Sequence, residues 1–295
     1  MRASRARQRY GSVVLAVLLI LLQGCAAPTP KPGVGLRQDA LNANDTGYHY
    51  YARGNLELAQ EKFAQALRLN RLIDHIPGIA ANLNNLGAIH QEQGQYDQAE
   101  RCYKEALALH RQQDDAAGIV ETLNNLGTLW QAQGKLKQAR AAYTEAQALA
   151  QLPGLERLLA LTLTHRGDLA RQQQDYDEAL SLYEQSRQLN TAYGAARGRA
   201  VSLERLGRTH LELGNFSQAE MDLKSALQEF RRLESVPGVI DALDGLFKLY
   251  LATGNQAAAQ DYGQRLCQLY KALGKTQEAQ RICLLLESLT ADSTH

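Results

Sequence analysis

The chain has 295 residues, of which 45% are apolar and 21% charged, with 32 basic against 31 acidic side chains. The apolar share is ordinary for a folded protein and excludes intrinsic disorder, while four Cys are too few for a disulfide scaffold. A net charge of +1 and a pI of about 7.7 argue against a dedicated nucleic-acid-binding protein, which would carry a basic excess.

The N-terminal segment over 1–25 has the features of an export signal. Four Arg between residues 2 and 9 precede an unbroken apolar run over 13–22, which is too short to span a bilayer core of roughly 30 Å. The following Leu22-Gln23-Gly24-Cys25 resembles the lipobox of bacterial lipoproteins. This resemblance implies a signal peptide over 1–24 and a lipid on Cys25, which becomes the new N-terminus. The alternative is an uncleaved anchor or a plain secretory signal.

The mature chain differs in charge from its precursor. Losing the four Arg of the signal peptide from the 32 bases leaves 28 against 31 acids. Residues 25–37 contain three of the six Pro and predict an extended tether outside any core. Ala26 rather than Asp follows the Cys, and the resemblance to Gram-negative lipoproteins then implies a periplasm-facing outer-membrane location.

A 40-residue lattice runs through the rest of the chain. Six equally spaced positions carry Gly54, Gly94, Gly134, Gln174, Gly214 and Gly254. An Ala stands five residues after each position, and an aromatic residue stands nine residues after each of the first four. Another Gly stands seven residues before each of the first five. Small and apolar residues recur at i, i+4 and i+7 within each copy, so the pattern predicts an all-α fold.

Each copy predicts two antiparallel helices. The lattice Gly is expected to end the first helix, where Gly adopts the left-handed conformation without strain. A Gly inside that helix costs about 1 kcal/mol against Ala, which indicates a close helix crossing. One hairpin cannot bury its apolar faces, but a stack can. The predicted repeats span 38–77, 78–117, 118–157, 158–197, 198–237 and 238–273, with a capping helix over 275–290 and a tail over 291–295, so that the solenoid covers 38–290.

The repeat resembles the tetratricopeptide repeat (TPR). The core pattern reads Leu86-Gly87, Gly94-Gln95-Tyr96-Asp97-Gln98-Ala99, Tyr103 and Ala106. The 40-residue period is longer than that of the common TPR, which is about 34. Together with an Asn-Asn-Leu-Gly block at 84–87 and 124–127, it is similar to kinesin light chain and LGN-type adaptors. The resemblance implies an α-solenoid that coils as a right-handed superhelix and binds partners in a concave groove.

Two copies depart from the pattern. Gln174 and Ser186 replace Gly and Ala in the fourth copy, which we interpret as a kink or hinge. Phe247 and Gly263 occupy the Gly and aromatic positions of the sixth copy. Pro77, Pro153 and Pro237 are predicted to lie between repeats and outside the helices. Four Gly that keep the 40-residue period mark the same junctions, namely Gly78, Gly118, Gly198 and Gly238.

Catalytic and metal-binding motifs are missing from the sequence. Gly274-Lys275-Thr276 lacks both the upstream Gly and the strand of a phosphate-binding loop. We therefore predict no enzymatic activity, no metal, no cofactor and no small-molecule substrate. Cys267 and Cys283 flank a predicted turn, so they form either a disulfide or two buried small apolar residues.

The groove residues are predicted from their distance to the lattice position. Residues ten, nine and six before it, with others one helical turn on, share one helix face. Neutral amides fill this face in copies two and three: Asn84, Asn85, Gln91, Asn124, Asn125 and Gln131. Amides suit the backbone of an extended peptide. Charged residues replace them later, chiefly Arg205, Arg208 and Lys248, and are expected to select the partner. Alternatively, the Asn stabilise neighbouring helices and the charges form a solvated face.

These features together predict a membrane-tethered adaptor of the bacterial cell envelope. The lipid on Cys25 would hold the chain to the membrane, and the groove would bind a peptide or a partner protein. Bacterial TPR lipoproteins that serve pilus or secretin assembly, or that regulate cell-wall enzymes, are similar in build. The alternatives are a glycan-binding or enzymatic protein that uses the groove as a pocket, and a structural spacer in an oligomer.

Overall fold

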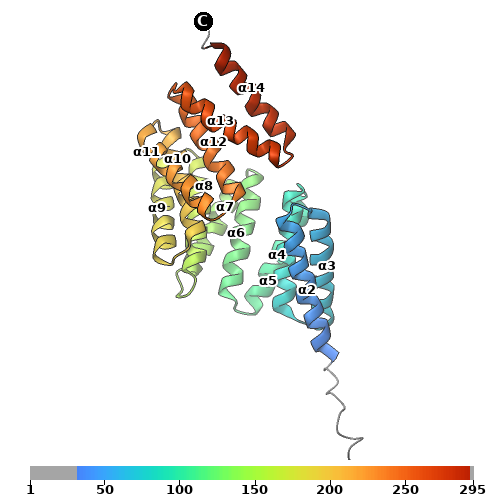
Figure 1. Ribbon diagram of the computed structural model, residues 1–295. Helices are drawn as coiled ribbons and strands as arrows, with labels where there is room; N and C mark the ends of the chain where they lie inside the picture. The colour runs from blue at the N-terminus through green and yellow to red at the C-terminus, as the bar shows by residue number, and fades with distance from the viewer. Residues whose placement is uncertain (1–31, 293–295) are drawn as a thin grey trace, which may run out of the picture. The chain divides into compact units, whose positions relative to one another are not determined.

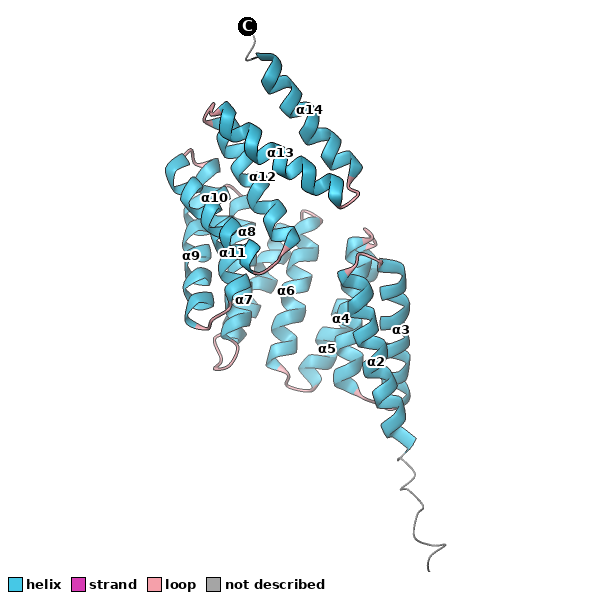
Figure 2. Ribbon diagram, in the orientation of Figure 1, coloured by secondary structure: helices cyan, strands magenta, loops and turns pink. Residues whose placement is uncertain are grey.

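The computed structural model describes residues 32–292, which form thirteen α-helices and, within that range, no strand. The helices alternate in direction and are joined by short turns (Figures 1 and 2). They are α2 (Pro32–Ala52), α3 (Leu56–Leu72), α4 (Ile76–Glu92), α5 (Tyr96–Gln112), α6 (Ala116–Ala132), α7 (Leu136–Ala150), α8 (Glu156–Gln172), α9 (Tyr176–Ala192), α10 (Ala196–Glu212), α11 (Phe216–Arg232), α12 (Val236–Ala252), α13 (Gln256–Ala272) and α14 (Thr276–Asp292). The predicted all-α solenoid of six helical hairpins and a last helix is confirmed.

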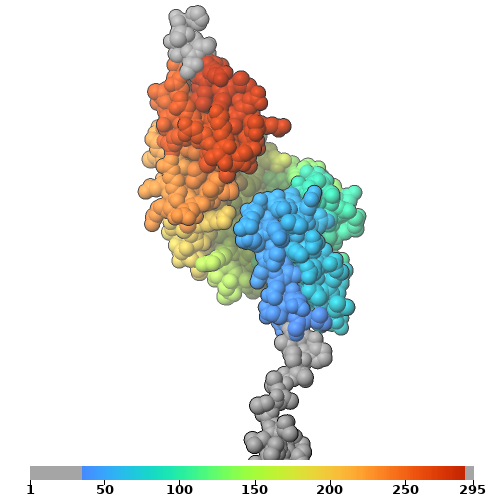
Figure 3. Space-filling model, turned by 45° about the vertical axis from the view of Figure 1, so that its right-hand side comes forward, coloured from blue at the N-terminus to red at the C-terminus, as the bar shows by residue number. Residues whose placement is uncertain are grey.

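The chain divides into two compact units, with the boundary between Asn82 and Leu83 inside α4. In the N-terminal unit, α2 packs along α3, and the Asn82 side chain links the hairpin to α4. Asn82 Nδ2 donates to Asn44 Oδ1 at 2.8 Å, and Asn82 Oδ1 accepts from Asn70 Nδ2 at 2.8 Å. In the C-terminal unit, each helix from α5 to α14 packs on the next. Its repeats appear on the surface as successive bands from yellow to red (Figure 3).

A left-handed residue follows each helix from α2 to α13, so the turns recur at a 20-residue spacing, half of the predicted lattice. The predicted Gly have φ between 70° and 75°, and Gln174 adopts the same conformation with φ 63°. The turns between repeats also contain one left-handed residue each, and only half of these residues are Gly. They are Asp74, Asp114, Gly154, Gly194, Glu234 and Gly274. The predicted role of the lattice Gly is therefore confirmed, and it extends to four residues that are not Gly.

The Gly inside the first helix of each pair receives the aromatic ring of the second. A Cβ built on Gly127 would lie 2.2 Å from Cε1 of Tyr143, and Tyr143 is fully buried. The same close approach recurs at Gly47, Gly87, Gly167 and Gly207, the last of which receives Leu223, so the predicted close crossing is confirmed. In the sixth repeat the two partners exchange places, because Phe247 is buried and Gly263 makes room for its ring.

Several predicted boundaries need correction. Helix α2 begins at Pro32, so residues 32–37 of the predicted tether are helical; Pro is tolerated in a first helical turn, where its missing N–H has no intrahelical partner. Pro77 and Pro237 also lie in first turns rather than between repeats. Helix α14 ends at Asp292, two residues into the predicted tail. The signal peptide, Cys25 and residues 26–31 fall outside the described residues.

The glycines that follow the repeat junctions also lie in first helical turns, not between helices. A Cβ on Gly118 would meet the His110 ring at 2.1 Å, and one on Gly198 would meet Asn190 at 2.2 Å. These glycines therefore admit a side chain of the preceding helix. Gly78 and Gly238 are packed in the same way.

The irregular segment of the C-terminal unit precedes the fourth repeat rather than lying within it. Helix α7 ends at Ala150, and the loop over 151–155 has five residues where the other turns between repeats have three; it is the long pink loop beside α7 in Figure 2. Helices α8 and α9 have the usual 17 residues. Ser186 is buried and its hydroxyl donates to the carbonyl oxygen of Ala160 at 2.8 Å, so the residue that replaces Ala joins α9 to α8 by a hydrogen bond.

Candidate functional site

The even-numbered helices of the C-terminal unit form one layer. Helix α6 contacts α8, α8 contacts α10 and α10 contacts α12, whereas among residues 83–292 the odd-numbered helices have no contacts of similar extent with one another. We call the surface of α4, α6, α8, α10 and α12 that is turned away from the odd-numbered helices the inner face. It carries the residues that the sequence predicts as the groove.

In repeats two to five, the residue ten before the lattice position is buried. Asn84 is 9% exposed and Asn124 is 1% exposed. Their Nδ2 atoms donate to Thr122 Oγ1 at 2.8 Å and to Thr162 Oγ1 at 2.9 Å, each on the next even-numbered helix. These two Asn therefore hold repeats together, and their prediction as peptide-binding residues is corrected. Successive side chains on an α-helix point about 100° apart. Asn84 and Asn124 therefore face the neighbouring helix, whereas the Asn that follow them are turned toward solvent.

In repeats two to five, the residues nine before the lattice position form a half-exposed row across four helices. It runs Asn85, Asn125, His165 and Arg205. A second row lies three residues further along each helix and becomes charged from the fourth repeat onward: Ala88, Thr128, Asp168, Arg208 and Lys248. The inner face thus offers neutral polar groups first and ionic groups later, in the order that the sequence predicts.

Gln91 and Gln131 serve the fold as well as the surface. The buried tyrosines pass over the Gly of the neighbouring helix and reach the inner face with their hydroxyls. Tyr103 donates to Gln91 Oε1 at 3.2 Å, and Tyr143 donates to Gln131 Oε1 at 3.1 Å. Gln131 Nε2 in turn donates to Gln172 Oε1 at 2.9 Å. Both polar ends of Gln131 are therefore engaged within the protein.

The charged part of the inner face is an ion-pair chain of alternating sign. Arg205 Nε lies 2.9 Å from Asp168 Oδ1, and Arg205 Nη1 donates to the buried Glu204 at 2.6 Å. Arg208 continues the chain from Glu204 to Asp244, and Lys248 Nζ ends it on Asp244 Oδ2 at 2.7 Å. The chain is Asp168, Arg205, Glu204, Arg208, Asp244 and Lys248. The three predicted cations thus have internal anionic partners that join α8, α10 and α12.

Burial shifts the titration of two groups in the middle of the face. It lowers the pKa of the His165 imidazole, against the opposing pull of the Asp168 carboxylate; the ring stacks on Tyr143 with centroids 5.8 Å apart. It also raises the pKa of the Tyr183 phenol, helped by Asp168. The phenol therefore stays protonated and donates to Asp168 Oδ1 at 2.8 Å.

Three further features bear on function. Cys267 and Cys283 form a disulfide between α13 and α14, which settles the two sequence interpretations of this pair. Within residues 32–292 no group of three or more acidic, His or Cys side chains is placed to hold a metal ion. No helix in the same range combines the length and the apolar character needed to cross a membrane.

The inter-repeat hydrogen bonds are what sequence reasoning missed. A signal for them exists, because the position of Thr122 and Thr162 keeps the period: Asn82, Thr122, Thr162 and Ser202 are all polar and buried. A polar residue recurring at a position that should be apolar indicates a hydrogen bond inside the stack, since buried polar groups need partners.

Comparison with protein families then decides the identity of the repeat. A family model described as tetratricopeptide repeat matches residues 78–151 and 158–231, just over half of the chain. The chain belongs to the TPR family. TPR proteins bind peptides or other proteins through such stacks, so this TPR chain is a protein-interaction scaffold. The comparison with curated protein sequences finds no match.

Solved structures share the TPR fold at low sequence identity. A Rap protein complexed with competence and sporulation factor is 13% identical with a TM-score of 0.64, over 86% of this chain and 75% of that one. PilF of Pseudomonas aeruginosa is 20% identical with a TM-score of 0.55, over 85% and 99%. PilW, described as a type IV pilus biogenesis factor, is 18% identical with a TM-score of 0.57, over 83% and 98%.

Proposed function

We propose that the TPR stack is a lipid-anchored scaffold of the bacterial envelope, and that its inner face binds an extended segment of a partner protein. The half-exposed row of Asn85, Asn125, His165 and Arg205 carries this proposal. It repeats once per TPR unit, and an extended peptide also presents its N–H and C=O groups at regular intervals. Amide side chains in such a row can engage the peptide backbone without selecting its sequence.

Selectivity would come from the ion-pair chain rather than from free cations. Lys248 is its exposed end, with 54% of the side chain accessible, and Arg205 and Arg208 lie deeper, at 29% and 23%. An acidic partner side chain would approach Lys248 first and compete with Asp244. Its exposure supports Lys248 as the proposed ionic contact, and the proposal assigns Arg205 and Arg208 a positioning role.

The disulfide supports an envelope location. Structural disulfides persist in oxidising compartments and are rare in the cytosol, and the Cys267–Cys283 bond lies in the part of the chain that the export signal would carry across the membrane. PilW is a type IV pilus biogenesis factor of the same fold, so pilus assembly is the first envelope process to test. Anchoring itself depends on Cys25. Cys25→Ser should abolish fatty-acid labelling in cells, and labelling that persists would refute the anchor.

The test of the inner face is a pair of double variants that differ by one helical position. Asn85→Ala with Asn125→Ala should weaken partner binding, since each lost hydrogen bond to the peptide contributes about 0.5–1.5 kcal/mol, and should lower the melting temperature less than the buried pair does. Asn84→Ala with Asn124→Ala should instead lower stability, because both side chains are buried and bonded between helices. The partner is first identified by cross-linking in intact cells. Equal loss of stability in both variants would remove the support for the binding row.

A further inference from the structure

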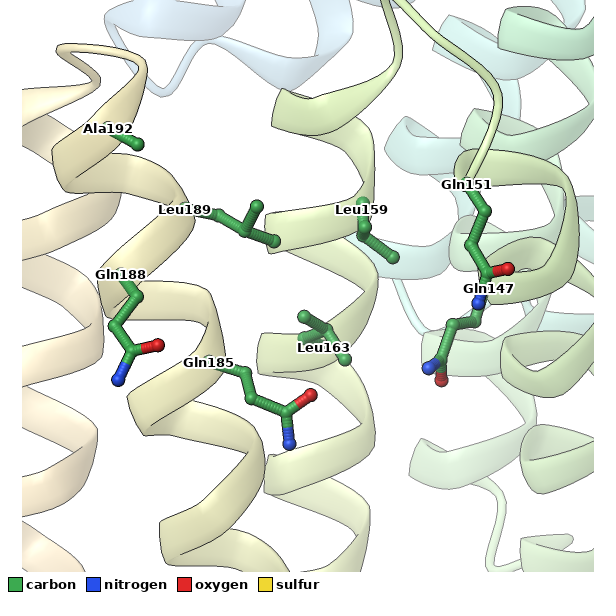
Figure 4. Close-up of a pocket in the computed structure, with 8 residues that line it drawn as sticks. All are labelled: Gln147, Gln151, Leu159, Leu163, Gln185, Gln188, Leu189 and Ala192. Atoms are coloured by element: carbon green, nitrogen blue, oxygen red, sulfur yellow. The ribbon is translucent and has the colours of Figure 1, made fainter.

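A cavity of about 400 Å³ opens on the other side of the stack, between α7 and α9. Its floor is α8, which contributes Leu159 and Leu163, and its walls are the last turns of α7 and α9 (Figure 4). Leu189 and Ala192 extend the apolar floor on the α9 side. Four glutamines complete the lining: Gln147, Gln151, Gln185 and Gln188. No side chain of this lining is ionisable.

The repeat period allows the same gap to be compared along the stack. In the preceding gap, Arg111 Nη2 of α5 reaches Glu145 Oε1 of α7 at 2.6 Å. The equivalent positions one repeat later are Gln151 and Gln185, so that ionic bridge is absent from the cavity.

The following gap, between α9 and α11, holds an ion pair between its floor and one wall. Arg199 Nη2 of α10 lies 2.7 Å from Glu229 Oε2 of α11. The equivalent positions one repeat earlier are Leu159 and Leu189. All four residues that form these two ion pairs are thus replaced here by Gln or Leu, and the space they would fill stays open.

The shortened end of α7 enlarges the same opening. Helix α7 ends at Ala150, and the five-residue loop with Pro153 leaves the stack where the other odd-numbered helices continue for another half turn. Ala192 on the facing wall has the smallest side chain of the lining. The irregular loop and the missing ion pairs therefore coincide at one place.

The amides of the two walls are already oriented by the protein. Gln147 Oε1 accepts from Arg166, which leaves its NH₂ on the α7 wall. Gln188 Nε2 donates to Glu184 Oε1 at 2.9 Å, and Gln185 Nε2 donates to Ser181 Oγ at 3.2 Å. The carbonyl oxygens of these two residues remain on the α9 wall. An extended backbone between the walls therefore meets the NH₂ of Gln147 on one side and the carbonyl oxygens of Gln185 and Gln188 on the other.

We propose that the groove formed by the eight lining residues named above is a second docking site, and that its occupant is an extended, uncharged peptide segment with an apolar side chain. The apolar side chain covers Leu159 and Leu163, and the glutamines hold the flanking backbone. A charged side chain is excluded, because the lining has no counter-ion to replace its hydration. The site is separate from the inner face and does not depend on its function.

The test uses the purified protein and two labelled probes, with affinity measured by fluorescence anisotropy. Both are end-blocked pentapeptides of Ser and Ala, one with Leu and one with Asp at the centre. The Leu peptide should bind saturably, and the Asp peptide at least about tenfold more weakly. Leu159→Arg with Leu189→Glu copies the ion pair of the following gap and should reduce Leu-peptide affinity by a similar factor. Gln151→Arg with Gln185→Glu, which copies the preceding gap, should do the same.

The control places the same charges on the same helices outside the lining. Leu161→Arg with Thr191→Glu should leave peptide affinity unchanged, as should Asn85→Ala with Asn125→Ala on the inner face; both wild-type residues of the first pair are exposed. Thermal melts exclude misfolded variants. No saturable binding to the wild type, equal binding of the Asp peptide, or unchanged binding to both ion-pair variants would overturn the proposal.

Discussion

Gly127 and Tyr143 set the distance between the two helices of their repeat. The ring occupies the place where any Cβ at 127 would stand, at 2.2 Å from Cε1, and its hydroxyl continues to Gln131 on the inner face. One residue pair therefore fixes both the packing of the hairpin and a side chain of the binding surface. Phe247 and Gly263 show that the ring can be supplied from either helix.

The exchange can be reproduced in the third repeat. Gly127→Phe should destabilise the protein by about 1–3 kcal/mol or more through overpacking against Tyr143. Adding Tyr143→Gly should restore part of that loss, because the double variant copies the sixth repeat. Urea unfolding of both single variants and the double variant gives the coupling energy, expected to be favourable and within about 0.5–3 kcal/mol. Purely additive effects would show that the two residues do not share one space.

Gln174 holds the left-handed conformation that Gly holds elsewhere, with φ 63°. Side chains with a Cβ are strained there by about 1–2 kcal/mol. Gln174→Gly should therefore stabilise the protein by up to about 1 kcal/mol, after the greater freedom of Gly in the unfolded chain is offset. Gln173→Gly, at φ −85°, is the matched control and should destabilise instead. Thermal melts of the two variants that shift in the same direction would contradict this account.

At the scale of helices, α14 depends on its covalent link to α13. It is the last helix of the stack and packs on α13, burying Ala279 and Ile282 while Leu284 and Leu285 remain exposed. The disulfide closes a loop of 16 residues between Cys267 and Cys283. A loop of that size restricts the unfolded chain by an amount equivalent to about 3 kcal/mol.

Cys283→Ser should therefore release α14 before the rest of the stack unfolds. Amide hydrogen exchange is expected to accelerate over 276–292 and to stay slow in α8 to α11, which are held by their neighbours on both sides. Reduction of the wild type should give the same pattern. Exchange that is unchanged in α14 would mean that packing alone holds this helix.

The helices were predictable from the sequence because each turn has its own residue requirement. The Gly lattice marks left-handed positions, and the Ala and aromatic positions mark the buried faces, so element order and pairing follow directly. Asn84 and Asn85 show where this reasoning stops. They are adjacent and chemically identical, yet one is buried between helices and the other is half-exposed. Which of the two is buried depends on how α4 is rotated about its axis relative to α6, and no local sequence pattern predicts that rotation.

The groove between α7 and α9 could not be predicted from the sequence for a related reason. It results from uncharged residues at four positions, on α8, on α9 and in the loop after α7, and from the early end of α7. Each substitution taken alone, such as Gln151 in place of Arg111 one repeat earlier, reads as an ordinary surface change. Only the packed helices show that the four positions face one space. The same limit applies to the ion-pair chain. Its cations could be predicted from the sequence, but the carboxylates that pair with them could not.

At the scale of the molecule, the C-terminal unit is a chain of contacts between neighbours. Each helix packs on the next one, and each even-numbered helix from α6 to α10 also touches the next even-numbered helix. The stability of such a stack is close to a sum of repeat terms and interface terms. A local defect should therefore remain local.

Gly207→Ala tests this independence. Its Cβ would lie 2.6 Å from Leu223, so the fifth repeat should be weakened and hydrogen exchange should accelerate in α9 to α12. Protection in α5 and α6 should persist. Gly87→Ala, whose Cβ would meet Tyr103 at 2.5 Å, is the reciprocal variant and should spare α11 to α13. Loss of protection across the whole unit from either change would establish a single cooperative fold instead.

The common spacing of left-handed turns has a consequence for how such a chain can change over generations. Because turns within and between repeats fall on one regular series, a duplication or loss of one repeat length that starts at any point of a repeat rejoins helix to helix in phase. The clamps between repeats, such as Asn84 with Thr122 and Asn124 with Thr162, share one sequence separation and re-form across the new joint. The length of the proposed binding surface can therefore change by whole repeats during evolution, without any new packing contacts.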